Sequence, residues 1–163
     1  MKIRKANLND LPEVVEIYNS TIAGRMVTAD IEPVSVEERM NWFLDHDNDK
    51  RPLFVVIKND EIVAWVSFSA FHERAAYNGT SEISIYIKEQ YRNQGLGEKI
   101  LSWSIDFAKE VEIENIVALI FGHNFPSIKL FEKFNFQKWA YLPGVARLDG
   151  VLRDLVILGY KIK

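Results

Sequence analysis

The sequence lacks cysteine altogether and contains no long apolar segment. Without cysteine, the chain can form no disulfide, no thiolate metal site and no cysteine nucleophile. No apolar run approaches the roughly 18 residues of a membrane-spanning helix, and residues 1–5 do not lead into the apolar core of an export signal. We therefore expect a soluble protein that stays in the cytoplasm.

The charge distribution argues against nucleic acid and membranes as partners. Lys and Arg total 20, Asp and Glu total 23, and the basic residues are spread along the chain, which carries a net charge of −3. Such a chain has no basic patch for nucleic acid or an anionic membrane. The three histidines share no metal-ligand spacing, so we expect no metal site. With 163 residues, 48% of them hydrophobic, we expect a single domain over residues 1–163.

A glycine-rich loop is the most informative feature that is present. Residues 92–97 read Arg-Asn-Gln-Gly-Leu-Gly and lie between a strand-like run, Ile83–Ile87, and a helix-like run. Gly95 and Gly97 can adopt positive φ, which lets backbone N–H groups turn toward one anion at the start of a helix. Arg92 adds a full positive charge. This order predicts a phosphate-binding loop, and the alternative is a turn that only connects the two elements.

Two better-known phosphate motifs are incomplete here. The dinucleotide motif needs a third glycine where this chain has Ile100, and no Gly-Lys-Ser/Thr sequence is present for a P-loop. Dinucleotides and nucleoside triphosphates are therefore not favoured as ligands.

Hydrophobic periodicity predicts strands that alternate with helices. Asp10 with Glu13, and Ser35 with Glu38, form capping-box patterns at two helix starts. In chain order we expect a strand at 2–6, a helix of about four turns from residue 11, a loop at 24–33, a helix at 36–44, a hairpin of 53–57 with 62–68, a strand at 81–87, a helix at 96–108, a strand at 116–121, a helix beginning at Pro126, and two strands at 136–142 and 152–160.

The strand at 81–87 alternates strictly between an apolar face and a polar face. Three isoleucines share the apolar face, and the polar face carries Glu82, Ser84 and Tyr86. The run at 116–121 is uninterrupted and apolar, which is typical of a strand that is buried on both faces. With the helix between them, the two strands form a parallel βαβ unit.

This order of elements resembles the GNAT superfamily of N-acetyltransferases over essentially the whole chain. The segment from Asn124 to Phe136 resembles that superfamily's Asn-x-x-Ser…Glu-Lys-x-Gly-Phe segment, with Asn135 in place of the usual glycine. Asn tolerates left-handed backbone better than most residues. The likeness is greatest to the phosphinothricin and methionine sulfoximine N-acetyltransferases, which have segments similar to Tyr18–Thr21, Glu32–Ser35, Arg74–Tyr77 and Glu82–Ile87.

The resemblance implies an α/β fold: a central, mostly antiparallel sheet with a splayed parallel strand pair, flanked by helices. It also implies acetyl-CoA as cosubstrate, lying between the strands 82–87 and 116–121. The cofactor-binding residues that it implies for the pantetheine arm are Ile85, Tyr86, Ile87, Asn124 and Ser127. Those that it implies for the pyrophosphate are Arg92, Asn93, Gln94, Gly95, Leu96 and Gly97.

The resemblance further implies direct acetyl transfer to the α-amine of a small amino-acid analogue. Glu82 is the expected general base, and the alternative is a solvated or salt-bridged carboxylate. The expected substrate-binding residues are Arg74, Tyr77, Glu82 and Ser84. Arg74 would bind the acceptor carboxylate, unless it is an ordinary surface arginine. Asn78 replaces the subgroup's second arginine. The segment 143–150 resembles a late loop of the subgroup in which Leu148 replaces a basic residue, so Arg147 either compensates or faces solvent.

Phe131 is the clearest departure from related enzymes, which often carry Tyr or His there to protonate the leaving thiolate. We expect Phe131 to be a core residue, and the thiolate to leave without a single essential phenol as acid. His123 is expected to have a supporting or structural part beside the cofactor site, and the alternative is that it approaches the cofactor itself. The alternatives to the leading function are a GNAT enzyme for another amine, such as a protein N-terminus or a polyamine, and a non-catalytic CoA-binding domain. A homodimer is also expected, because family members commonly dimerise.

Overall fold

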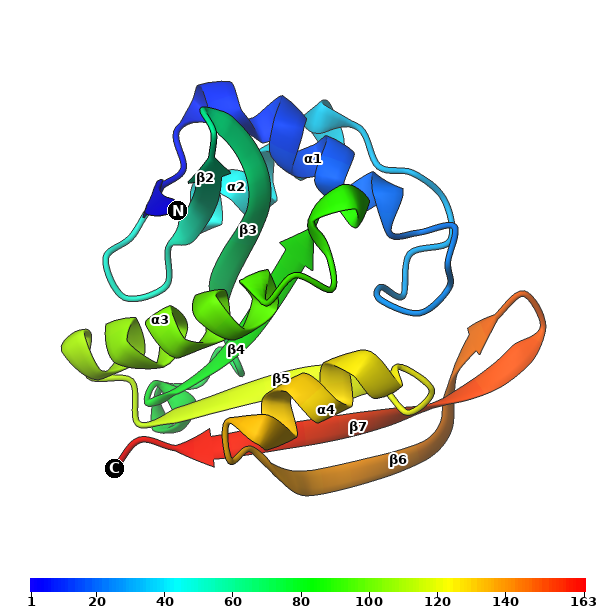
Figure 1. Cartoon of the computed structure of the whole chain (residues 1–163). Coiled ribbons are helices and arrows are strands. Elements are labelled where there is room, and N and C mark those ends of the chain that lie inside the picture. The colour runs from blue at the N-terminus through cyan, green and yellow to red at the C-terminus, as the bar shows by residue number, and fades with distance from the viewer.

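The computed structural model describes residues 1–163 and contains a seven-stranded mixed sheet with helices on both faces (Figure 1). The strands are β1 Lys2–Lys5, β2 Leu53–Lys58, β3 Glu61–Ala70, β4 Thr80–Ile87, β5 Asn115–Phe121, β6 Gln137–Leu148 and β7 Val151–Lys161, in the sheet order β1-β2-β3-β4-β5-β7-β6. The helices are α1 Leu11–Ser20, α2 Val36–Asp45, α3 Leu96–Glu110 and α4 Phe125–Lys133. This architecture confirms the predicted fold class. None of the helices combines the length and the apolar composition that crossing a membrane requires.

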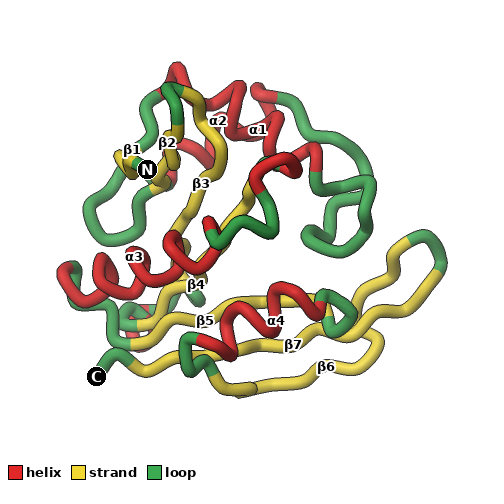
Figure 2. The backbone as a smooth tube through the Cα atoms, in the orientation of Figure 1, coloured by secondary structure: helices red, strands yellow, loops and turns green.

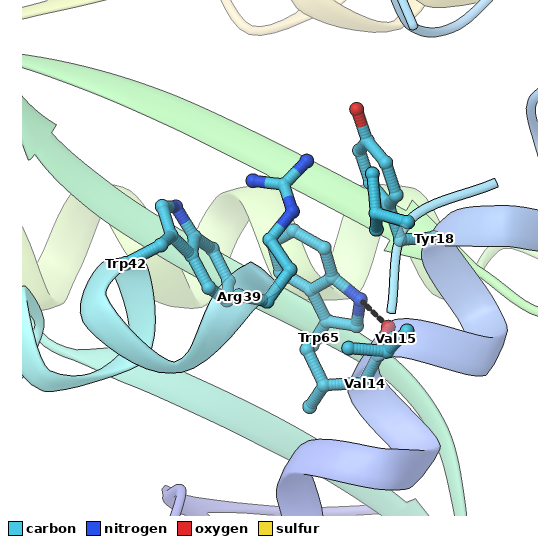
Figure 3. Close-up of a pocket in the computed structure, with 7 residues that line it drawn as sticks. Val14, Val15, Tyr18, Arg39, Trp42 and Trp65 are labelled. Atoms are coloured by element: carbon cyan, nitrogen blue, oxygen red, sulfur yellow. Dashed lines mark hydrogen bonds between the residues drawn. The ribbon is translucent and has the colours of Figure 1, made fainter. Parts of the chain in front are cut away.

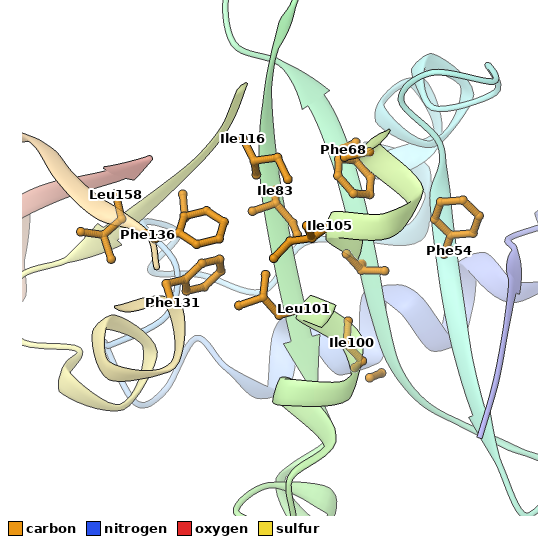
Figure 4. Packing of buried hydrophobic residues seen from close by; sticks show 14 of the residues in the cluster. Phe54, Phe68, Ile83, Ile100, Leu101, Ile105, Ile116, Phe131, Phe136 and Leu158 are labelled. Atoms are coloured by element: carbon orange, nitrogen blue, oxygen red, sulfur yellow. The ribbon is translucent and has the colours of Figure 1, made fainter. Parts of the chain in front are cut away.

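The sheet separates the hydrophobic core into two clusters, and helices lie on both sides of the sheet (Figure 2). Helices α3 and α4 cover one face of the sheet over a cluster of 20 buried residues, which includes Phe68, Ile83, Ile100 and Phe131 (Figure 4). Helices α1 and α2 cover the other face over β2, β3 and β4, with a second cluster of 7 buried residues that includes Trp65. The apolar stripe of each helix therefore faces the sheet, as helical spacing predicts.

The sheet opens between its two central strands. The parallel strands β4 and β5 pair only at Thr80–Asn115, Ser81–Ile116 and Glu82–Val117. Beyond Glu82, β4 remains paired with β3, and β5 remains paired with β7 up to Phe121. Figure 1 shows the two strands diverging toward their carboxyl ends. The edge of β4 that faces β5 therefore has no strand partner past Glu82, as the resemblance implied.

The predicted cap of the first helix is wrong by one turn. Asp10 makes no side-chain cap for α1; instead, Asn7 and Asp10 form a capping box around a 3-10 turn at Leu8–Asp10. Arg4 donates to both oxygens of Asp10, at 2.7 and 3.0 Å, so the carboxylate is committed to the preceding turn. Helix α1 ends at Ser20 and is shorter than the four turns expected. At the second helix start, Ser35 is confirmed as the cap, because its Oγ accepts from Glu38 N at 3.1 Å, but the Glu38 side chain does not return the bond that a full capping box requires.

Two expectations for the C-terminal half also need correction. Segment 143–150, expected to be a loop, is mostly strand, because β6 extends to Leu148 and only Asp149 and Gly150 turn the chain into β7. Leu148 is buried, whereas Arg147 is exposed and donates only to Gly150 O. Strand β5 is not buried throughout, since Leu119 is 40% exposed on the face that α1 and α2 leave uncovered.

Helix α4 ends in a left-handed residue. Asn135 has a φ of +67°, and Phe136 N donates to Phe131 O at 3.2 Å in a Schellman-type closure. The left-handed backbone explains why glycine is usual at this position and why asparagine can replace it.

We predict that Asn135→Ala lowers the free energy of unfolding by about 1 kcal/mol, because alanine has no side-chain hydrogen bond to offset left-handed backbone. Asn135→Gly is the matched control and should be at least as stable as the parent. Urea denaturation followed by circular dichroism measures both. An alanine variant as stable as the parent would contradict the argument.

Candidate active site

The glycine-rich loop follows β4 and forms a concave turn of backbone. After a 3-10 turn at Glu89–Tyr91, Asn93 and Gly95 adopt left-handed conformations with φ of +58° and +79°. Alternating left-handed residues turn backbone N–H groups toward one side, as in anion-binding nests. Arg92 is half-buried, and its Nε donates to Ile87 O at 2.9 Å, which holds the loop against the end of β4.

The start of α3 completes this loop. Gly95 is the N-cap residue and supplies no side-chain cap, so the first N–H groups of the 15-residue helix are left for an anion. Gly97 has a different role from Gly95. A Cβ atom there would lie 3.2 Å from Leu130 Cδ2, so Gly97 allows close packing of α3 against α4. Leu96 is buried under the loop, and Gln94 is exposed and donates to Gln90 O at 2.8 Å.

Glu82 lies at the last paired position before β4 and β5 separate. Its side chain is half-buried, and it takes part in no hydrogen bond or ion pair within the protein. Burial raises the pKa of the Glu82 carboxyl above its usual value. A half-buried carboxylate with no partner at the edge of an opening is a candidate proton acceptor.

Aromatic side chains cover part of the strand face that carries Glu82. Tyr86 stacks on Trp65, with 4.4 Å between ring centroids, and lies 5.3 Å from the Tyr18 ring. Burial raises the pKa of the Tyr86 phenol far above its usual value. The expectation of a wholly polar face is therefore wrong at Tyr86, because α1 and α2 pack over this part of the strand.

A small pocket lies beside these aromatic residues, between α1 and α2. Figure 3 shows the Arg39 guanidinium between Trp42 and Tyr18. The cavity has a volume of about 10 Å³, and its lining is otherwise apolar. Arg39 lies 4.4 Å above the Tyr18 ring centroid and binds Asp30 at 3.2 Å, so its charge is neutralised within the protein.

Residues 25–30, here called the strap, connect the two sides of the opened sheet. On one side, Tyr18 donates its phenolic proton to Asp30, and its oxygen lies 2.6 Å from Thr28 Oγ1. On the other side, His123 Nε2 donates to Arg25 O at 2.8 Å. The strap therefore links α1 to the turn that follows β5.

The turn after β5 positions Asn124 and Ser127. Asn124 is buried; its Oδ1 accepts from Ser127 N at 3.3 Å at the start of α4, and its Nδ2 donates to Met26 O at 3.2 Å. Asn124 thus caps α4 and anchors the strap, and one proton of its amide group stays free for a ligand. Nowhere in the chain do three or more His, Asp or Glu side chains form a group that could hold a metal ion.

Comparison with known proteins places this geometry in a family. Residues 13–136 match the Acetyltransferase (GNAT) family. The chain belongs to the GNAT acetyltransferase family. The predicted resemblance is therefore confirmed, as is the prediction that the chain is an acyltransferase.

The individual relatives include acetyltransferases named for phosphinothricin and for methionine sulfoximine. YwnH of Bacillus subtilis, classed provisionally as a phosphinothricin acetyltransferase, is 50% identical over 99% of this chain and 99% of its own. An L-methionine sulfoximine/L-methionine sulfone acetyltransferase of Pseudomonas aeruginosa is 27% identical over 96% of this chain and 91% of its own. The solved structure of YncA from Salmonella typhimurium with its cofactor acetyl-CoA has a TM-score of 0.91 and 26% identity, covering 99% of this chain and 94% of that one.

Phe131 is a core residue in this GNAT chain, as predicted. It is 6% exposed and packs edge-on against Phe136, with 5.0 Å between ring centroids. Phe131 carries no ionisable group, so it supplies no proton.

The remaining predicted residues are not gathered in one place. Ser84 lies between Glu82 and Tyr86 on the same face of β4. Arg74 and Tyr77 are exposed on the connection from β3 to β4, where Tyr77 packs against His72 with 4.8 Å between ring centroids. That connection adjoins Thr80, at the end where β4 and β5 are still paired.

Sequence reasoning missed the strap. Asp30 is 12 residues from Tyr18, and the carbonyl of Arg25 is 98 residues from His123. Neither separation produces a periodic signal, so no pattern in the sequence could have revealed these contacts.

Glu82 also predicts a pH dependence of stability. Because its pKa is raised in the folded state, its contribution favours folding below the ordinary carboxyl pKa and is lost as the pH rises through the raised value. Glu82→Gln should therefore be more stable than the parent at pH 7, and this advantage should shrink below about pH 4. Thermal unfolding of both proteins from pH 3.5 to 8 tests this. If the difference in Tm between Glu82→Gln and the parent is the same at every pH, the Glu82 carboxyl does not have the raised pKa inferred here.

Proposed function

We propose that this chain is an acetyl-CoA-dependent N-acetyltransferase for the α-amine of a small amino-acid analogue of the phosphinothricin or methionine sulfoximine type. The observation that carries the proposal is the position of Glu82. An unpaired, half-buried carboxylate stands where a parallel strand pair opens, on the strand whose carboxyl end leads into a loop shaped for phosphate.

Acetyl-CoA fits the opened strand pair and the loop. The free edge of β4 at Ile85, Tyr86 and Ile87 offers backbone groups to an extended pantetheine arm, as in strand addition. The left-handed Asn93 and Gly95 and the uncapped start of α3 suit the pyrophosphate. The other proposed contacts to the cofactor are Arg92, Gln94, Leu96, Gly97, Asn124 and Ser127. When bound, acetyl-CoA supplies the acetyl group as a thioester.

The residues of the chain then have distinct tasks. An α-ammonium group has a pKa near 8, so Glu82, directly or through one water, can remove its proton at neutral pH. The free amine attacks the thioester carbonyl, and backbone N–H groups near Ile85 hold the negative charge that develops on the oxygen. The C–N bond forms and the C–S bond breaks. Glu82 passes the first proton on to water, and the second proton, which the nitrogen loses as it becomes an amide, passes through water to the departing thiolate.

No phenol in the chain is proposed to protonate the leaving sulfur. Phe131 lacks a proton to give, and the raised pKa of Tyr86 makes its phenol a poor donor. A thiol with a pKa near 8.5 is a tolerable leaving group as the thiolate.

The proposed acceptor is supported by the names of relatives and by residues carried over from the resemblance. The names of the relatives support an amino-acid analogue, and Ser84, Tyr77 and Arg74 are the acceptor contacts carried over from the resemblance. Because Arg74 and Tyr77 are exposed, a protein N-terminus or a polyamine remains the second candidate acceptor.

We also propose a cytoplasmic homodimer. The support for a dimer is the face of β5, β7 and β6 that no helix covers, where Leu119 and Trp139 are 40% and 42% exposed. Light scattering at micromolar concentration measures the mass in solution.

The decisive experiment measures CoA release with a panel of amines: methionine sulfoximine, methionine sulfone, phosphinothricin, ordinary amino acids, a polyamine and a short peptide. We expect turnover with the amino-acid analogues. Glu82→Gln should lower kcat/KM by about 10² or more with acetyl-CoA affinity nearly unchanged.

Glu110→Gln, at an exposed position at the end of α3, is the matched control and should retain parental activity. If kcat/KM of the Glu82→Gln variant is within threefold of the parent's at pH 7, Glu82 is not the general base. Turnover only with the polyamine or the peptide would refute the proposed acceptor.

A further prediction concerns the phosphate loop. Gly95→Val should weaken CoA binding at least tenfold, because a β-branched residue resists a φ of +79° and turns the N–H groups away. Gly95→Asn tolerates that conformation and should bind within about threefold of the parent. Calorimetry with CoA decides, and equal affinities for the Val and Asn variants would contradict the assignment.

A further inference from the structure

Ser69 is the residue directly opposite Glu82 in the sheet. Strand β3 pairs antiparallel with β4, and the register sets Ser69 against Glu82. Directly opposed residues of an antiparallel pair point to the same face, with their Cβ atoms about 5 Å apart. Both side chains are half-buried, and the Glu82 carboxyl makes no hydrogen bond within the protein. The Ser69 hydroxyl and the Glu82 carboxyl are therefore close enough for one water to bridge them.

His46, the residue that ends α2, packs onto Ser69 from the helix side. Its Nε2 lies 3.1 Å from Ser69 Oγ, and its Nδ1 lies 2.7 Å from Trp42 O, one turn earlier in α2. The His46 side chain is buried, and its ring centroid lies 4.8 Å from that of Trp42. Two hydrogen bonds and an aromatic contact thus fix the imidazole against the serine.

These contacts determine the direction in which the Ser69 hydroxyl donates. A backbone carbonyl can only accept, so His46 Nδ1 carries a proton and donates to Trp42 O. Burial lowers the pKa of the His46 imidazole, so the ring is neutral at pH 7 and its Nε2 is an acceptor. Ser69 therefore donates its one proton to His46 Nε2, and toward any other group its oxygen can only accept.

Two acceptors side by side set the orientation of a water that binds them both. The Glu82 carboxylate accepts, and so does the oxygen of Ser69 once its proton is committed to His46. A water between them donates both of its protons to the protein and turns its own lone pairs outward. In that orientation a water can take a proton from an ammonium group.

We propose that Ser69 and His46 are positioning residues that orient the water through which Glu82 deprotonates the acceptor amine. This inference rests on the proposed function and specifies how its base operates. The ammonium nitrogen gives one proton to the water oxygen, and the water gives one of its own protons to Glu82. The free amine and an intact water result. Ser69 and His46 keep their own protons throughout and act only by holding the water.

The test uses pH to separate proton removal from a general structural defect. Ser69→Ala should lower kcat/KM for methionine sulfone about tenfold at pH 7, the effect of losing one hydrogen bond in the transition state. The KM for acetyl-CoA should not change. At about pH 9.5 an α-amine with a pKa near 8 is already free, so the loss should shrink to about twofold or less. CoA release by the folded variant measures all three quantities.

Two further serine variants control for the substitution itself. Ser69→Thr keeps a hydroxyl at the same position and should stay within about threefold of the parent at both pH values. Ser102→Ala removes an exposed hydroxyl from α3 and should behave as the parent.

A double-variant cycle tests whether His46 acts through Ser69. His46→Leu removes the acceptor for the Ser69 proton and should reproduce the loss of kcat/KM at pH 7. Added to Ser69→Ala, it should cause no further loss, because residues that act as one unit are not additive. His46→Gln offers an amide oxygen in place of Nε2 and should recover part of the activity that His46→Leu loses.

A Ser69→Ala variant with the kcat/KM of the parent at pH 7, or with the same loss at both pH values, would overturn the inference. A further loss when His46→Leu is added to Ser69→Ala would also overturn it, because His46 would then only fasten α2 to β3. If Glu82→Gln still loses about 10² in kcat/KM, the proposed base stands and only this inference fails. A parent that acetylates none of the amines would refute the proposed function, and this inference with it.

Discussion

The short ladder between β4 and β5 is the constraint on which the site depends. Three residue pairs join the strands, and each strand then stays with its antiparallel neighbour. The sheet thus consists of two halves, β1-β2-β3-β4 and β5-β7-β6. The two halves are joined at one end of β4 and β5 and separate at the other end. This separation leaves backbone groups of β4 without a strand partner and brings Glu82 to the edge of an opening.

The rest of the site follows from how the two halves are bridged. On one face, α3 and α4 pack together through Gly97 and Leu130, and the glycine-rich loop lies between the carboxyl end of β4 and the start of α3. On the other face, the strap is held by Tyr18 from one half and by His123 from the other. Most polar groups of these bridges are satisfied within the protein. His123 Nδ1 is the exception among them, because it is buried and has no hydrogen-bond partner.

Much of this arrangement could be predicted from the sequence because its causes are local. The alternation of Ile83 and Ile85 with Glu82 and Ser84 defines the faces of β4 wherever the strand lies. Left-handed backbone at Gly95 and Asn135 is a property of those residue types. Errors arose where tertiary contacts overrode a local signal: Arg4 draws Asp10 away from the predicted cap, and pairing with β7 carries β6 through a segment with loop-like Pro143 and Gly144.

The sequence by itself therefore determined the order of elements, the glycine-rich loop, the candidate base and the resemblance to the family. Tertiary structure alone decided where the sheet opens, because strand separation depends on ladders formed with β3 and β7. It also decided which arginines find partners within the protein, and Arg153 is the half-buried arginine that donates no side-chain hydrogen bond. No sequence pattern distinguishes a paired arginine from an unpaired one, since pairing depends on residues that are distant in the chain and meet only in the fold.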